Sequence, residues 1–565
     1  MNSRVKIYLF FLILVFNILI RADSNLSIDN LQKRMVNIQK NINLLGNALE
    51  QKLTAKFTLE QERAIQFLDM TEAFLDEAEV YLELNDLYEA DLRITFAETM
   101  LKKTLVPLAT SPLVEGRIIS LDATTLSQKA MANQIADLVE EIANANFNTI
   151  FVEVIRGDGY CVYPSKFQVQ TEELLGQDPL LELIDRAKQY EIDIFPWVKM
   201  FYATSNKTPG PILINHPEWI ALDRYGNGYE KAGLVWYNPA HPQARDFIYN
   251  SILELFQNYD FAGCQLDYVR YPVNLTEDND FSYDVYSREL FRSFYGIDPI
   301  NIPYVPYSIR AQSDYQRGDS GSLFASWLSF REEMVTSLVG RVSIALRSIK
   351  PDLPISIGII TALWGGGTIQ QAWFRMQNWP IWLENHYADY LSPMIYQDDA
   401  NVVEREVKAI TELIKNRALQ YPSLGVHAMT DPYQLIKQIE IIRNSGIAGM
   451  RIFAYPHLKQ EHFRALIEGP FREKAIPPHR DVIKASLLRA NELTDLFPQE
   501  TDLILLVQAL DSIPKNHGYS RYNTIKKALT TAKKLGKIEN QRIQYELNYI
   551  CSYLEVALYT ERLYK

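Results

Sequence analysis

The sequence has few cysteines and no excess of positive charge, and both shortages limit what the chain can be. Only three cysteines occur in 565 residues, at Cys161, Cys264 and Cys551. An odd number without metal-ligand spacing argues against a disulfide framework and a zinc site, so we expect no metal and no cofactor. The net charge of -12 disfavours a nucleic-acid partner, because phosphates bind to basic surfaces.

Long hydrophobic runs are also scarce, and the clearest one lies at the N-terminus. Arg4 and Lys6 precede a mostly apolar run over 7–20. A basic flank before a run that is short for a membrane span is typical of an export signal, with a buried core helix as the alternative. We therefore expect 1–22 to be a signal peptide or signal anchor of a secreted, periplasmic or envelope protein. An uncleaved signal would anchor the protein to a membrane.

Helical patterns flank a central region. Over 23–110 a heptad spacing predicts one helix and an apolar helical spacing over 59–105 predicts a second. We expect a helical hairpin, with an intermolecular coiled coil and self-association as the alternative. Residues 476–565 are predicted to be a C-terminal helical module that packs with these helices. The heptad positions are Ile28, Leu31, Met35, Ile38, Ile42, Leu45 and Leu49.

The central region, 111–475, alternates short apolar runs with amphipathic helical stretches. Eight successive β-α units over this length favour a (β/α)₈ barrel over a doubly wound sheet. Such a barrel carries its functional residues where the strands end. The predicted strands cover 116–122, 148–156, 193–200, 263–271, 354–361, 389–396, 423–429 and 449–456.

The predicted strand ends are rich in carboxylates and aromatic residues. Asp267 ends the fourth strand, Glu153 lies on the second, and Asp398 follows the sixth. Two carboxylates over an aromatic bowl are the apparatus of glycoside hydrolysis, with retention or inversion of configuration left open. Each has a structural alternative: an ion pair of Asp267 with Arg270, a buried pairing of Glu153 with a neighbouring strand's cation such as Arg270, and a solvated loop for Asp398. Candidate sugar contacts at strand ends are Trp197, Arg270, Trp364 and His427. The two tryptophans are equally compatible with packing, and the more common role of a residue like His427 is a hydrogen-bonded core histidine.

The fourth-strand stretch "FAGCQLDYVRYP" resembles the signature of the glycosyl-hydrolase-like family ten catalytic domains. It differs at Ala262 and Cys264. The resemblance covers about 113–475 and includes "NFNTIFVEVIRGDGYCVYPS", "HPEWIALDRYGN", "VWYNPAHPQARDFI" and "DYLSPMIYQ" in the family's order.

The resemblance implies a barrel that hydrolyses envelope or extracellular glycans, including peptidoglycan glycan strands. It implies that Asp267 is the nucleophile or base and Asp398 a candidate proton donor. The sequence "YQDD" after the sixth strand departs from the family pattern, so Glu153 competes for the acid role. Sugar-binding blocks of the family match Arg156, Asp158, Tyr160, Asn238 and Tyr396.

Two other functions remain open from the sequence. The barrel could bind a glycan without cleaving it, with the heptad helices binding a partner. Alternatively, Lys199 on the third predicted strand could form a Schiff base in a lyase or aldolase.

Overall fold

The computed structural model describes residues 26–52, 59–272, 276–310, 322–361, 376–429, 431–515 and 518–563. The predicted export signal over 1–22 lies outside these ranges. Within them, no helix combines the length and apolar character needed to cross a bilayer. The chain forms two compact units, Met1–Thr110 with Glu468–Pro470, and Ser111–Ile467 with Phe471–Lys565.

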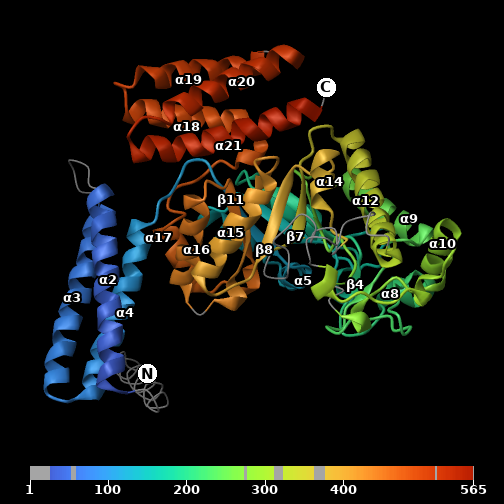
Figure 1. Cartoon of the computed structure of the whole chain (residues 1–565), viewed down its shortest axis with the longest axis horizontal. Coiled ribbons are helices and arrows are strands. Elements are labelled where there is room, and N and C mark those ends of the chain that lie inside the picture. The colour runs from blue at the N-terminus through green and yellow to red at the C-terminus, as the bar shows by residue number, and fades with distance from the viewer. Residues whose placement is uncertain are drawn as a thin grey trace. The chain divides into compact units, whose positions relative to one another are not determined.

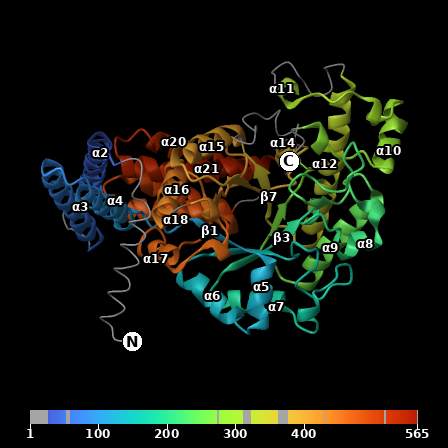
Figure 2. The same cartoon turned by 90° about the horizontal axis from the view of Figure 1, so that it is seen from below.

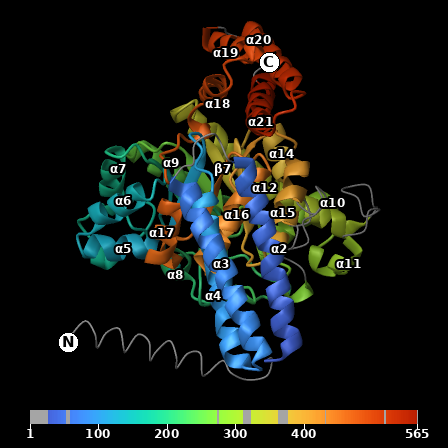
Figure 3. The same ribbon diagram turned by 90° about the vertical axis from the view of Figure 1, so that its left-hand side faces the viewer.

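The first unit contains α2 (Ile28–Lys52), α3 (Leu59–Glu83) and α4 (Leu87–Leu108), which lie side by side in Figure 3. The heptad residues of α2 are mostly buried in the core of this bundle. The stretch 59–105, which was expected to form a single helix, forms the two helices α3 and α4. Asn85 adopts a left-handed conformation (φ 57°), and Asp86 caps the new helix by accepting from the Glu89 N–H. Both residue types favour such a break.

The second unit contains the predicted barrel (Figures 1 and 2). Its parallel strands follow one another around the sheet, and β10 pairs with both β8 and β11 while β11 pairs with β1, which closes it. The prediction of a (β/α)₈ barrel is confirmed, and the open doubly wound sheet is excluded. The strands are β1 (Gly116–Leu121), β2 (Thr149–Glu153), β3 (Asp193–Lys199), β6 (Cys264–Asp267), β7 (Ile355–Ile360), β8 (Tyr390–Ile395), β9 (Leu419–Gln420), β10 (Ser423–Gly425) and β11 (Gly449–Phe453).

Both faces of β2 are apolar because both are buried. Phe151 belongs to the same buried cluster as Phe195 and Trp197, inside the barrel. Val152 instead belongs to the large core beneath the outer helices. Since side chains alternate along a strand, Glu153 shares the interior face with Phe151. Principal outer helices are α6 (Ile135–Asn144), α7 (Pro179–Lys188), α9 (Pro242–Asn258), α12 (Leu323–Ile349), α15 (Ala400–Ile414) and α16 (Pro432–Asn444).

The C-terminal module packs on the barrel itself. Tyr549 and Tyr553 of its last helix share a buried cluster with barrel residues that include Phe195, and the Tyr549 hydroxyl donates to the Arg443 carbonyl at 2.8 Å. Figure 1 shows these red helices against one end of the barrel. The opposite end, where the strands finish, carries the cavity described below. The module contains α18 (Val482–Leu496), α19 (Thr501–Ser512), α20 (Gly518–Leu535) and α21 (Gln541–Leu563).

Candidate active site

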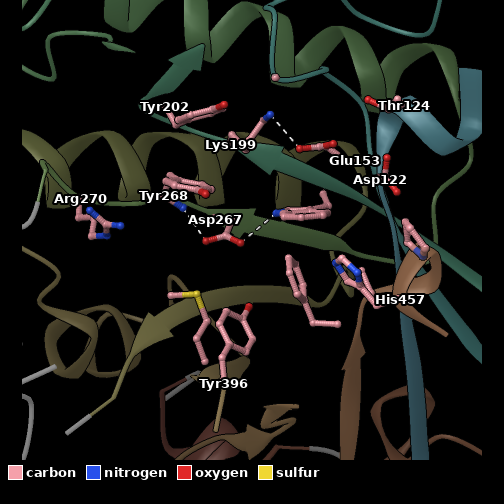
Figure 4. A pocket seen from close by; sticks show the side chains of 16 residues that line it. Asp122, Thr124, Glu153, Lys199, Tyr202, Asp267, Tyr268, Arg270, Tyr396 and His457 are labelled. Carbon is pink, nitrogen blue, oxygen red and sulfur yellow. Dashed lines mark hydrogen bonds and ion pairs between the residues drawn. The ribbon is translucent and has the colours of Figure 1, made fainter. Parts of the chain in front are cut away.

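A cavity of about 490 Å³ opens at the C-terminal ends of the barrel strands. This is where barrel enzymes bind their substrates. Its walls combine charged groups with aromatic rings from several different strands and loops (Figure 4). The charged lining residues are Asp122, Glu153, Lys199, Asp267 and Arg270, and the ring-bearing ones are Trp197, Tyr202, Tyr268, Tyr396, Phe453 and His457.

Asp267 ends β6 and is only 5% exposed. Its Oδ2 accepts a hydrogen bond from Trp197 Nε1 at 2.9 Å, and its Oδ1 accepts one from the Tyr268 backbone N–H at 2.7 Å (Figure 4). Tyr268 has a positive φ of 50°, a strained conformation for a tyrosine, and this turn aims its N–H back at the carboxylate. Two N–H donors hold the carboxylate in one orientation.

Gly358 on the neighbouring strand β7 provides the space that Asp267 occupies. A Cβ at position 358 would lie 2.9 Å from Asp267 Oδ1 and 3.1 Å from its Cγ. Both contacts are shorter than van der Waals separation, so any larger residue would displace the carboxylate or the strand. The glycine is therefore part of the geometry that holds Asp267.

Glu153 and Lys199 form an ion pair on neighbouring strands. Lys199 Nζ lies 2.8 Å from Glu153 Oε1, and the two side chains are 4% and 12% exposed, respectively. The second oxygen of Glu153 accepts from the Ala123 N–H at 3.0 Å. The structural alternative raised for Glu153, pairing with a neighbouring strand's cation, is thus observed, but the cation is Lys199 and not Arg270.

Aromatic rings form two stacked pairs around the carboxylates. Tyr202 stacks on Tyr268 with ring centroids 4.7 Å apart, and Tyr396 stacks on Phe453 at 5.0 Å. Burial raises the pKa of Tyr396 to about 12, so its phenol stays protonated near neutral pH and can donate a hydrogen bond. Such walls suit sugar rings, which present apolar C–H faces together with hydroxyl edges.

Residues 117–424 match the protein family described as glycosyl hydrolase-like 10. The chain belongs to this family. The resemblance seen in the sequence is therefore confirmed, and the matched segment runs from the second residue of β1 to the second residue of β10 and includes Asp267 and Glu153.

Several curated relatives are similar to this chain. Glycosyl hydrolase YngK of Bacillus subtilis is 26% identical over 182 residues, covering 29% of this chain and 34% of that protein. Glycosyl hydrolase DigH of Escherichia coli K12 is 20% identical over 318 residues, covering 49% and 61%. An S-layer-related protein of Niallia circulans is 24% identical over 233 residues, covering 37% and 14%. The match thus spans only part of each relative.

Arg270 follows Asp267 in this glycosyl hydrolase-like 10 member but does not pair with it. Among the residues that the structure describes, no acidic side chain lies within ion-pair distance of the guanidinium. Its Nη1 donates to the Tyr271 carbonyl at 2.9 Å. The structural alternative raised for Asp267, an ion pair with Arg270, is therefore not observed.

Asp398, a candidate acid from the resemblance, is half-buried after β8 and is not among the residues that line the cavity. Within the described part of the chain its Oδ1 has no hydrogen-bond partner. Its neighbour Asp399 caps α15 by accepting from the Asn401 N–H at 2.8 Å. No contact with Asp267 is formed.

The remaining expected sugar contacts are spread around the cavity. Tyr396 and Trp197 line it, and exposed His427 lies beside it, its ring centre 5.3 Å from that of His457. Asn238 is fully buried and accepts from the Ala240 N–H, away from the lining residues. Trp364 lies outside the described residues.

The glycine-containing loop after β2 carries its own ion-pair network. Arg156 pairs with Asp158 at 2.6 Å and with Glu173 at 2.7 Å, and the Tyr160 N–H bonds Asp158. Only Gly157 of this loop lines the cavity. Arg156, Asp158 and Tyr160 therefore hold the loop beside the cavity.

Sequence reasoning did not select several lining residues. Asp122 follows β1, and Tyr268 and His457 follow other strands, so their places at strand ends were visible signals. Tyr202 lies on β4 (Tyr202–Thr204), which pairs with β5 (Val235–Trp236) in a small sheet outside the barrel. Nothing in the local pattern around Tyr202 predicts that this insertion turns it back over the cavity.

Proposed function

We propose that this protein is a glycoside hydrolase that uses two carboxylates, Asp267 and Glu153, to cleave a polysaccharide. The observation that carries the proposal is that both carboxylates line one aromatic-walled cavity at the C-terminal end of a barrel. Glycoside hydrolysis requires one carboxylate that stays charged and one acid that protonates the leaving oxygen. Membership of a glycosyl hydrolase-like family supports the same reaction.

Asp267 suits the role of nucleophile or base. Its two N–H donors fix both oxygens, and the group lines the cavity. As a nucleophile it would bond to the anomeric carbon while the leaving sugar departs, and as a base it would take a proton from the attacking water.

Glu153 is the proton donor that we propose, because it lines the same cavity as Asp267. Lys199 Nζ lies 2.8 Å from Glu153 Oε1, so a proton of Lys199 would pass to Glu153 as Glu153 gives one to the glycosidic oxygen. The glycosidic oxygen would receive its proton from the Glu153 carboxyl, and the proton taken from water in the second step would restore it. Asp398 is the alternative donor, and it would first have to reach the cavity.

A glycan-binding protein without hydrolase activity is the second candidate. Both Glu153 oxygens are already engaged, by Lys199 and by the Ala123 N–H, and this favours a structural role for the carboxylate. A Schiff-base mechanism has less support, because Lys199 Nζ is already engaged by Glu153 at 2.8 Å.

The site of action that we propose is the cell envelope or the extracellular space. A basic residue pair before an apolar run over 7–20 supports export, and one relative is named an S-layer-related protein. The substrate would then be an envelope or extracellular polysaccharide, with peptidoglycan glycan strands as one candidate.

Product analysis tests the proposal. The full chain is incubated with a panel of purified envelope and matrix polysaccharides, and new reducing ends and unsaturated sugars are measured. A hydrolase produces reducing ends without unsaturated sugars. Retention of a glycan with no new ends would instead identify a binding protein, and unsaturated ends would identify a lyase.

A further inference from the structure

Arg270 is held in the cavity wall by aromatic rings. Its guanidinium carbon lies 5.0 Å from the ring centre of Trp236 and 5.6 Å from that of Tyr268. The Nη1 hydrogen bond to the Tyr271 carbonyl fixes its rotation. A guanidinium stacked and anchored in this way has one orientation, so it is prepared to bind a ligand without ordering itself first.

The other edge of this guanidinium, formed by Nε and Nη2, has no hydrogen-bond partner among the described residues, although Arg270 lines the cavity. Burial lowers the pKa of Arg270, and Glu230 is the acidic group that most opposes this shift, but the two form no ion pair. Arg270 is half-buried, and a charge pair at a partly buried site is stronger than one in bulk water.

The other charges of the cavity already have partners. Lys199 pairs with Glu153, and Asp122 caps α5 (Ala123–Met131) through Thr125. Asp267 accepts from Trp197 and Tyr268. The segments 273–275 and 362–375, which follow β6 and β7 in the sequence and lie outside the described residues, contain no aspartate or glutamate.

We infer that the free edge of Arg270 binds a carboxylate of the substrate, so that the polysaccharide cleaved in this cavity is an acidic one. This inference rests on the proposed function and names its substrate class. The planar carboxylate matches the paired N–H groups of a guanidinium, and the Nε and Nη2 edge of Arg270 has no hydrogen-bond partner among the described residues. A sulfate ester presents the same single charge, so the experiment separates the two.

The test compares acidic glycans with their own neutral forms. Uronate-containing polysaccharides are reduced at the carboxyl to give otherwise identical neutral chains, and a sulfated glycan without uronate forms a third group. Affinity of the full chain for each is measured by retardation in gels containing the glycan. The inference predicts at least one acidic glycan bound about 10- to 100-fold more tightly than its reduced form, and no comparable preference for sulfate.

Arg270→Gln should abolish that preference, so that the acidic glycan and its reduced form bind with affinities within about twofold of each other, and Arg270→Lys should restore only part of it. Arg341→Gln is the matched control, because Arg341 also stacks on a tyrosine, Tyr249, at 3.9 Å but lies outside the cavity. Equal or absent binding of every acidic and reduced pair overturns the inference, as does a preference that Arg270→Gln leaves intact.

These readouts do not depend on turnover. A carboxylate preference without new reducing ends would refute the hydrolase and keep the acidic ligand. Hydrolysis of neutral glycans alone would support the hydrolase and refute the acidic ligand.

Discussion

Trp197 and Asp267 are joined by a hydrogen bond of 2.9 Å from the indole Nε1–H to Oδ2. The sequence left Trp197 open between a platform for sugar rings and a packing residue, and the structure shows that its polar edge holds the carboxylate. Its ring also packs edge-on against Phe453 at 5.8 Å, so the donor is rigid. A fixed donor matters for catalysis, because small displacements of a reacting group cost rate.

Trp197→Phe removes this donor and keeps most of the ring. We expect kcat on a cleaved glycan to fall about 10- to 100-fold, because a hydrogen bond to a charged group contributes about 1.5–3 kcal/mol. Steady-state kinetics measure this, with near-UV circular dichroism as the check on folding. An unchanged kcat would mean that the indole does not hold the reacting group.

Gly358→Ala introduces a methyl group 2.9 Å from Asp267 Oδ1. We expect a loss of activity of at least tenfold, because the carboxylate must move away from its two donors. Gly46→Ala in α2 is the control, since nothing lies within 4 Å of a Cβ at that position. Full activity in Gly358→Ala would show that Asp267 tolerates displacement.

Lys199→Met leaves Glu153 as a buried charge without its cation. Breaking one partner of a buried pair costs about 3–5 kcal/mol, and we expect Lys199→Met with Glu153→Gln to recover part of that loss. Urea unfolding followed by tryptophan fluorescence measures it, because all eight tryptophans lie in the barrel-bearing unit. Strictly additive losses would argue against the coupling.

Glu153→Gln tests the proton donor. We expect activity on natural linkages to fall by about 10²–10⁴-fold, with much smaller losses on aryl glycosides whose leaving groups need no proton. Asp398→Asn is the comparison. If Asp398→Asn shows the leaving-group dependence and Glu153→Gln does not, the donor is Asp398.

The buried Glu115 predicts a stability loss in acid. Burial alone would raise the pKa of Glu115, but Arg443 at 2.7 Å and Arg117 at 2.9 Å lower it below its ordinary value. The contribution of Glu115 is therefore complete above the unfolded pKa, about 4.3, and is lost as pH falls through the lower folded value.

Unfolding free energies measured by urea between pH 7 and 3 should show this decline, and Glu115→Gln should be less stable at pH 7 with a shallower decline. The exposed Glu182→Gln serves as control, because its pair with Arg186 is 3.8 Å long and half-exposed. A parallel decline in Glu115→Gln and the wild type would assign the acid sensitivity to other groups.

The sequence predicted the barrel and Asp267 because strand alternation and strand ends are local signals. It did not determine on which face of β2 the side chain of Glu153 lies. One face packs against the outer helices and the other lines the barrel interior, so both carry apolar residues. The sequence also did not show that Asp267 and Arg270 form no ion pair. The left-handed turn at Tyr268 ends the regular strand, so the alternation of side chains no longer predicts where Arg270 points. The ion pair of Glu153 with Lys199 depends on the side-chain placement of two strands, which neither strand encodes alone.

The central claim is that Asp267 performs the chemistry of this cavity. Its most direct test is the single-turnover rate of Asp267→Asn on a glycan that the wild type cleaves, with the exposed Asp260→Asn as control. We predict a fall of at least about 10³-fold in Asp267→Asn and an unchanged rate in Asp260→Asn. A folded Asp267→Asn protein that cleaves within tenfold of the wild type would contradict the account.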